Sequence, residues 1–175
     1  NIDREISLDD LQNIPGILWI EPVLTTQSRN VMASAYMGDG SPTTQPHWDF
    51  GLNGQDIILG VADSGIDDDH SCVRNDTDSV GQIGDGHRKI LISNTSINDG
   101  DNPGQSDYRH GTHVAGSLVC HDVYSYVNDE PPNNGSTIAY KAKLIFQDIV
   151  SDDGWMPPEN VTELLLENSQ NGGII

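Results

Sequence analysis

One stretch of the chain carries residues suited to proton-transfer chemistry: Arg109-His110-Gly111-Thr112-His113-Val114-Ala115-Gly116-Ser117-Leu118. Loop-type residues precede it and its own residues are small and apolar, which predicts a helix whose first turn carries His110. Its small residues, Gly111, Ala115 and Gly116, indicate close packing against a sheet or a substrate-facing surface. Because the positive end of the helix dipole disfavours an imidazolium, a catalytic histidine here needs a nearby carboxylate.

The candidate for that carboxylate is Asp63, which follows the apolar run from Ile57 to Ala62. A continuous apolar, β-branched run predicts a strand buried on both faces of a parallel sheet, and Ser64-Gly65 predicts a turn directly after it. Asp63 would then lie at the carboxyl end of a central strand, where open α/β sheets bind ligands. An aspartate after a strand also serves as a turn residue or helix N-cap, so position alone leaves both roles open.

Together the two stretches resemble the marked motifs of the subtilisin-like serine proteases, the subtilases. The matching segments are Val61-Ala62-Asp63-Ser64-Gly65-Ile66 and His110-Gly111-Thr112-His113-Val114-Ala115-Gly116. They follow in the family's chain order, aspartate before histidine. The resemblance implies that Asp63 orients and charge-stabilises His110, and that His110 is general base and then general acid for a serine nucleophile. It also implies a serine endopeptidase with polypeptide substrates and no cofactor for catalysis.

The nucleophile itself is not among these residues. No serine stands in the Gly-Thr-Ser-x-Ala/Pro setting that marks the subtilase nucleophile. The chain starts at Asn1 without a methionine and stops just after an apolar run begins at Gly172-Gly173-Ile174-Ile175, so both ends look cut. We therefore expect a segment of a longer protein, truncated on the C-terminal side of the domain. Its serine and oxyanion asparagine would lie beyond residue 175, and the segment alone should be inactive.

Two other functions compete with this interpretation. Zinc binding is disfavoured because His110 and His113 are three apart with Gly111 after the first, whereas zincins space the pair by four with a glutamate after the first. His113 is instead expected to pack behind His110. A degenerate protease-like domain acting as a binding or inhibitory module is the other alternative, since a fold does not imply a function. The remaining histidines show no partner pattern: His47, His70, His87 and His121.

The N-terminal part of the chain differs from the rest. Residues 1–29 contain a predicted short helix, a Pro-Gly turn and a strand between Leu8 and Val23, which resembles the tail of the inhibitory pro-region that precedes many subtilase domains. An ordinary leading αβ element of the main domain is the alternative. Residues 30–47 are a predicted linker or exposed loop, and processing is expected between Thr25 and Gln45.

Residues 48–175 are expected to form the N-terminal part of the catalytic domain. Strands are predicted at 57–62, 89–93, 139–150 and after Gly172, and loops at 67–86 and 122–137. A further helix is predicted to open at Pro157-Pro158-Glu159, with one face lined by Val161, Leu164, Leu165 and Leu166. The alternation indicates an α/β fold, a three-layer and mostly parallel sheet with flanking helices. The subtilase resemblance implies the same architecture.

Composition limits the partners. Eight basic against 27 acidic residues give a net charge of −19, which argues against binding to nucleic acid or an anionic membrane. No stretch resembles a membrane span. Acidic clusters at 67–69, 99–101 and 152–153 are expected to be solvated, with calcium or basic substrate side chains as alternatives. Relatives often carry a calcium-binding aspartate where Ser71-Cys72-Val73 stands here, so structural calcium is possible but cannot be placed.

Two features bear on the compartment. Glycosylation sequons occur at Asn75, Asn94, Asn134 and Asn160, which supports a secretory or extracellular location. Cys72 follows the Asp63 turn and Cys120 closes the His110 helix, so an oxidising compartment would favour a bridge between the two motifs. Two unrelated buried thiols are the alternative.

Overall fold

The computed structural model describes residues 45–94, 103, 107–130, 136–151, 154–156, 158 and 160–174. The predicted pro-region tail, nearly all of the predicted linker, the acidic clusters at 99–101 and 152–153 and the sequon asparagine Asn134 lie outside these residues. The division of the chain into 1–29, 30–47 and 48–175 therefore stays a prediction.

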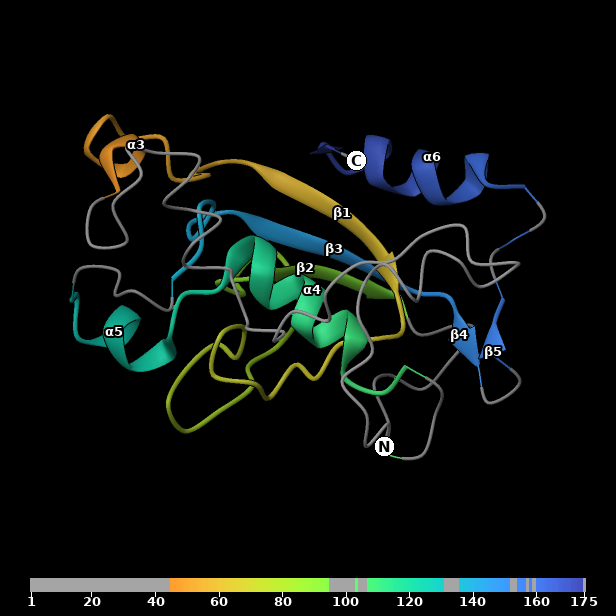
Figure 1. The fold of residues 1–175 in the computed structure, drawn as a ribbon, viewed down its shortest axis with the longest axis horizontal. Helices are drawn as coiled ribbons and strands as arrows, with labels where there is room; N and C mark the ends of the chain where they lie inside the picture. The colour runs from red at the N-terminus through yellow and green to blue at the C-terminus, as the bar shows by residue number, and fades with distance from the viewer. Residues whose placement is uncertain are drawn as a thin grey trace, which may run out of the picture.

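The centre of the fold is a sheet of four parallel strands in the order β2-β3-β1-β6 (Figure 1). The strands are β1 (Ile58–Asp63), β2 (Ile90–Asn94), β3 (Lys143–Asp148) and β6 (Gly173–Ile174). β1 pairs with β3 along its whole length, so Asp63 lies opposite Asp148 at the carboxyl ends of both strands. A separate antiparallel hairpin joins β4 (Val150–Ser151) to β5 (Gly154–Trp155).

Helices cover both faces of this sheet, as Figure 1 shows for α4 and α6. Among the described residues the helices are α3 (Pro46–Asp49), α4 (His110–Val119), α5 (Val123–Val127) and α6 (Thr162–Gln170). Side chains of β3 alternate between the two layers: Leu144 and Phe146 belong to the core that includes α4 residues, whereas Gln147 accepts a hydrogen bond from Asn168 of α6. The predicted three-layer, parallel α/β fold is confirmed.

The main core lies between the sheet and α4. Its buried members are Val61, Ile66, Val73, Ile90, Ala115, Val119, Ala142, Leu144 and Phe146. The face of β1 that points away from α4 is less buried than its apolar sequence predicts, since Ala62 is exposed. The position of α6 over this face explains the difference. α6 sits closest over Gly60, where an added Cβ would lie 2.4 Å from the Asn168 side chain, and it leaves Ala62 uncovered.

The prediction for α6 was wrong in two respects. The helix begins at Thr162, because Asn160 accepts the backbone N–H groups of Thr162 and Glu163 and so ends the preceding loop. Its leucines do not share a buried face: Leu165 and Leu166 are exposed, since consecutive residues lie about 100° apart around a helix. The residue that α6 buries is Asn168, only 2% exposed.

Two further boundaries differ from the sequence prediction. The strand expected at 139–150 begins at Lys143 because turns precede it, with the Ala142 N–H donating to the Ala139 carbonyl. The loop expected at 122–137 contains the short helix α5, whose first turn is capped by the Asp122 carboxylate through the Tyr124 and Ser125 N–H groups.

Candidate active site

Asp63 and His110 meet at the carboxyl edge of the sheet. Asp63 is the last residue of β1 and is buried, and His110 is the first residue of α4 with a side chain 55% exposed. Asp63 Oδ1 lies 2.7 Å from His110 Nδ1 and also accepts the Ser64 N–H at 2.7 Å. The acceptor oxygen is thus fixed by the main chain, and the imidazole presents its other nitrogen away from the carboxylate.

The carboxylate sets the protonation behaviour of the histidine. The hydrogen bond that His110 donates to Asp63 and the negative charge of Asp63 raise the pKa of His110 above its ordinary value; slight burial lowers it, and the Asp107 charge raises it further. This opposes the helix N-terminus, which disfavours the imidazolium. The sequence-based requirement for a nearby carboxylate is therefore met by the residue that was predicted.

Gly111 allows β1 and α4 to come this close. A Cβ on Gly111 would lie 2.1 Å from the Gly65 carbonyl oxygen, 2.9 Å from the Phe146 ring and 3.2 Å from Asp63 Oδ1. Ala115, one turn further, is fully buried. The predicted close packing holds for these two residues but not for Gly116, where an added Cβ would meet nothing within 4 Å.

Ser64 connects the end of β1 to the start of α4 by hydrogen bonds. Its buried hydroxyl donates to the Asp107 carbonyl at 3.0 Å and accepts the Gly111 N–H at 2.9 Å. The same Asp107 carbonyl accepts the His110 N–H at 2.8 Å. The sequence predicts only a turn at Ser64, because the partners of this side chain lie more than forty residues along the chain and no local spacing reveals them.

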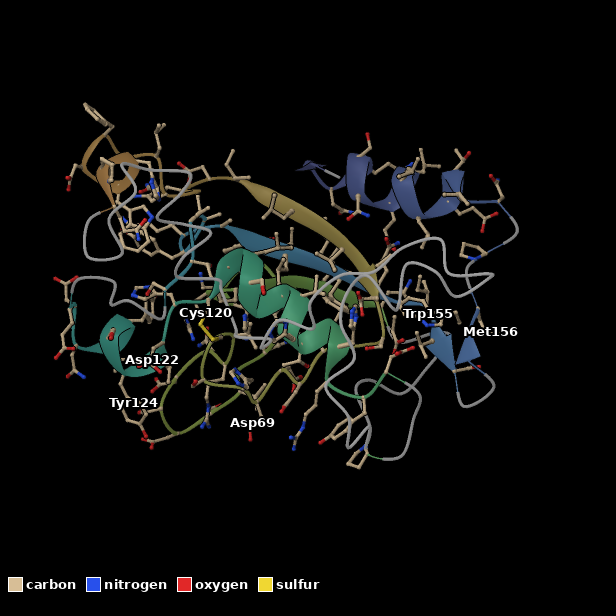
Figure 2. The ribbon with its side chains drawn as sticks, viewed as in Figure 1. Asp69, Cys120, Asp122, Tyr124, Trp155 and Met156 are labelled. Carbon is tan, nitrogen blue, oxygen red and sulfur yellow. A yellow bond between two sulfur atoms is a disulfide. The ribbon has the colours of Figure 1, made fainter. Side chains whose placement is uncertain are left out.

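An exposed tryptophan from the β4–β5 hairpin borders the histidine, and Figure 2 labels it together with Met156. The Trp155 Nε1–H donates to Asp107 Oδ2 at 2.6 Å, and its ring meets the His110 ring edge-on at a centroid distance of 6.4 Å. Trp155 is 48% exposed and Met156 is also exposed. Neither was singled out from the sequence, since a two-residue strand after an acidic loop carries no recognisable motif.

The other histidines do not take the place of His110 in this contact. His113 is exposed on α4, so the prediction that it packs behind His110 is wrong; the buried positions of α4 follow a spacing of four from Gly111, and His113 lies off that stripe. His87 is buried and has a structural role, since its Nδ1 accepts the N–H groups of Lys89 and Ile90. Within the part of the chain that the structure describes, no group of three or more His, Cys, Asp or Glu side chains could hold a metal ion.

A disulfide joins Cys72 to Cys120, which is the first of the two alternatives that the sequence left open. Cys72 belongs to the loop that follows Asp63, and Cys120 caps the C-terminal end of α4, where Figure 2 labels it. The bridge connects the segment after the aspartate motif to the helix that carries the histidine. Arg88 links the same two segments by hydrogen bonds. It donates to the carbonyls of Ser71 and Arg74 near Cys72 and to the carbonyl of His121 next to Cys120.

An aspartate–histidine pair at the carboxyl edge of a parallel sheet, with the histidine at a helix N-terminus, is the arrangement expected of a subtilisin-like fold. The sequence matches the subtilase family, Peptidase S8, over residues 54–171. The chain belongs to this family. The match includes both motifs and every strand of the central sheet except the last.

Two relatives come from Dictyostelium discoideum. The chain is 36% identical over 110 residues to the serine protease/ABC transporter B family protein tagA, an alignment that covers 59% of the chain and 6% of that protein. It is 32% identical over 124 residues to the protein tagD of the same description, which covers 66% of the chain and 6% of tagD. The chain thus spans a small fraction of either relative. None of the helices that the structure describes has the length and apolar character needed to cross a bilayer.

Proposed function

We propose that this chain supplies the acid–base half of a serine endopeptidase site that hydrolyses peptide bonds. The observation that carries the proposal is the 2.7 Å contact between Asp63 Oδ1 and His110 Nδ1 at the end of β1. Asp63 accepts the Nδ1–H, which leaves Nε2 with the lone pair needed to take a proton. Because the imidazole is exposed, a serine hydroxyl can approach that nitrogen.

Each residue then has one task. His110 Nε2 takes the proton of a serine hydroxyl while the oxygen attacks the peptide carbonyl, and it later returns the proton to the departing amine. Asp63 stabilises the intervening imidazolium through the hydrogen bond and negative charge that already raise the pKa of His110. No serine here stands in the Gly-Thr-Ser-x-Ala/Pro setting, so we assign the serine and the oxyanion donor to sequence outside these 175 residues, and the chain alone should not turn over substrate.

Labelling by a serine-directed fluorophosphonate tests the proposal in the full-length protein. We expect covalent labelling and casein hydrolysis that chelators do not abolish, and the loss of both in His110→Ala. His113→Ala is the matched control, because His113 is an exposed histidine of the same helix with no contact to Asp63, and it should retain activity. A folded protein that neither reacts nor cleaves would instead support the binding-module alternative. Activity that chelators abolish would point to metal chemistry.

We also propose secretion of the parent protein, supported by the Cys72–Cys120 disulfide and the sequons. Asn160 is exposed and is the better acceptor. The Oδ1 of each asparagine accepts a main-chain N–H, from Arg88 for Asn75 and from Thr162 for Asn160, but Asn75 is half-buried. Mass spectrometry of the full-length protein expressed in eukaryotic cells should find a glycan on Asn160 at higher occupancy than on Asn75. Unmodified protein at both sites would count against the secretory route.

Removal of residues 1–29 is proposed as the activating step, with the segment acting before that as an inhibitory partner of the site. N-terminal sequencing of active protein should find a start between Thr25 and Gln45. A mature protein that retains Leu8 to Val23 would favour the alternative, in which those residues are part of the main domain.

A further inference from the structure

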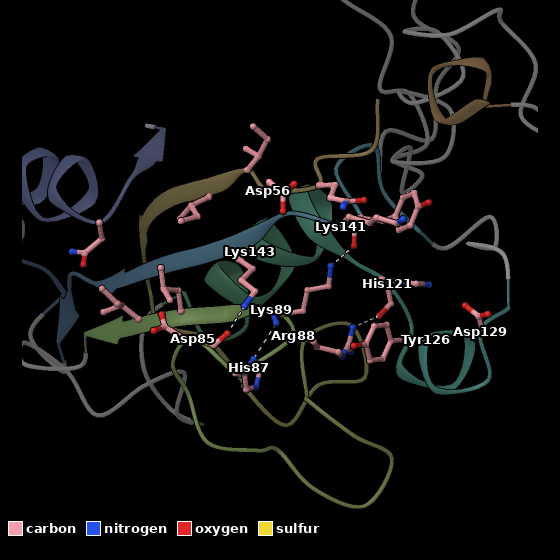
Figure 3. Close-up of a pocket in the computed structure, with 18 of the residues that line it drawn as sticks. Asp56, Asp85, His87, Arg88, Lys89, His121, Tyr126, Asp129, Lys141 and Lys143 are labelled. Carbon is pink, nitrogen blue, oxygen red and sulfur yellow. Dashed lines mark hydrogen bonds between the residues drawn. The ribbon is translucent and has the colours of Figure 1, made fainter. Parts of the chain in front are cut away.

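A cavity of about 1280 Å³ opens at the amino ends of β1 and β3 (Figure 3). Ile57 and Ile58 line it at the start of β1, and Lys143 lines it at the start of β3. Asp63 lies at the other end of β1, so the cavity is separate from the aspartate–histidine pair. Its volume is large enough for a small organic ligand, for which about 300–1000 Å³ is typical.

The cavity collects positive charge in a strongly acidic chain. The full sequence has eight basic residues and a net charge of −19. Four of those basic residues line this one cavity, including every lysine of the chain: Arg88, Lys89, Lys141 and Lys143. Figure 3 shows Arg88 and Lys89 next to each other between the sheet and α5. Half of the basic residues of the chain therefore line this one cavity, together with four carboxylates.

The two innermost cations have no carboxylate partner among the described residues. Lys89 is 2% exposed, and its Nζ donates only to main-chain carbonyls, those of Tyr140 and Ala142. Burial and the neighbouring Arg88 lower the pKa of Lys89 to about 7. Arg88 also donates to carbonyls alone, and burial lowers its pKa to about 10. Both shifts reflect the burial of positive charge, and for Arg88 the nearby Tyr126 and Asp122 offset that burial only in part.

His121 adds an unused hydrogen-bonding group to the same wall. His121 is 8% exposed, and its Nε2 is buried without a hydrogen-bond partner in the described structure. Burial, together with Lys89 and Arg88, lowers the pKa of His121 to about 4, so the ring is neutral near pH 7. A neutral imidazole can donate one N–H. A buried polar atom without a partner costs free energy that a bound acceptor would recover.

The charges at the mouth of the cavity limit what can enter. Four carboxylates line it, all on exposed residues: Asp56, Asp85, Asp129 and Glu130. They would repel a polyanion, whereas a single anionic group could pass them and reach Lys89. The walls nearby are apolar and aromatic, with Ile57 and Tyr126 exposed and Tyr140 stacked edge-on against His121.

We propose that this cavity binds a small organic anion, with one carboxylate or phosphate group at Lys89, Arg88 and His121 and an apolar body against Tyr126, Tyr140 and Ile57. The net charge of the chain does not prevent this. At physiological salt the field of remote surface charges is screened beyond about 8 Å, while buried cations are screened much less. The site does not depend on the peptidase proposal, because it shares no residue with the aspartate–histidine pair.

A titration of the folded chain with phenyl phosphate, followed by amide NMR shifts, tests the site. In about 0.15 M salt we expect saturable shifts at Lys89, His121 and Tyr140 and none at His110. Phenol is the neutral control and should bind about tenfold more weakly or not at all. Equal binding of phenol, shifts confined to His110, or no saturation by about 10 mM phenyl phosphate would overturn the proposal.

Matched variants separate a specific site from diffuse attraction. Lys89→Met and Lys141→Gln each remove one lysine charge, the first buried and the second exposed. We expect about tenfold weaker binding in Lys89→Met and less than about threefold in Lys141→Gln. Equal losses would mean that general electrostatics attract the probe, which contradicts the proposal. If Lys89→Met does not fold, His121→Phe decides, since it removes the unpaired Nε2 and keeps the aromatic volume.

Discussion

The carboxylate of Asp107 is held 2.6 Å from the indole nitrogen of Trp155, and both side chains lie beside the imidazole of His110. The charge of Asp107 adds to that of Asp63 in raising the pKa of His110. A histidine that acts as general base works only when neutral, so activity should fall as the pH falls through its pKa. Asp107 and Trp155 therefore influence the acid limb of the pH–rate profile without being part of the pair.

Asp107→Asn should move that acid limb to lower pH, because the variant removes a negative charge that favours the imidazolium. Trp155→Phe should move it in the same direction by less, since it releases the carboxylate without neutralising it. The measurement is kcat/KM against pH in the full-length protein. Asp129→Asn, an exposed acid near the other edge of the sheet, is the control and should not shift the profile. A shift to higher pH in Asp107→Asn would contradict the assignment.

Asp63→Asn and His110→Ala should each lower kcat by about 10⁴ or more and leave the fold intact. The asparagine cannot stabilise the imidazolium and favours the wrong tautomer, while the alanine removes the base. Steady-state kinetics on the full-length protein, with circular dichroism for the fold, provides the check. Near-normal turnover in either variant would remove both residues from the mechanism.

The aspartate–histidine pair was predictable because its signal is local. Asp63 ends an apolar run and His110 starts a run of small residues, so each position in the fold follows from its neighbours in sequence. The disulfide was predictable only as one of two alternatives, since two cysteines do not reveal their separation in space. The resemblance to subtilases supplied the roles that the residues alone left open.

The supporting residues could not be predicted, because their partners are distant in sequence. Ser64 contacts Asp107 and Gly111, and Trp155 reaches Asp107 from a two-residue strand. The buried face of α6 was also misjudged. A run of leucines indicates a core helix, but tertiary packing here places Asn168 over Gly60 and leaves Leu165 and Leu166 exposed.

Removal of the disulfide by Cys72→Ser with Cys120→Ser should lower the free energy of unfolding. The bridge closes a loop with a sequence separation of 48, for which the chain-entropy relation predicts a loss of about 4 kcal/mol. Urea unfolding of the oxidised protein and the double variant measures this difference. Equal midpoints, with thiol titration confirming the bridge in the parent, would show that the bridge does not constrain the unfolded chain.

Two glycines of α4 should respond to alanine in opposite directions. Gly111→Ala places a methyl group 2.1 Å from the Gly65 carbonyl oxygen and 2.9 Å from Phe146, so β1 and α4 must separate. We expect a loss of about 1–3 kcal/mol in stability, as for other overpacked core sites. Gly116→Ala meets nothing within 4 Å and should gain about 0.5–1 kcal/mol from helix propensity alone. Urea unfolding of both variants tests the pair together.

The two variants should also differ in activity. Because the separation at Gly111 lengthens the Asp63–His110 contact, the activity of the full-length protein should fall in Gly111→Ala and stay at the parent level in Gly116→Ala. Equal stability in the two variants would mean that the close approach of β1 to α4 is not required.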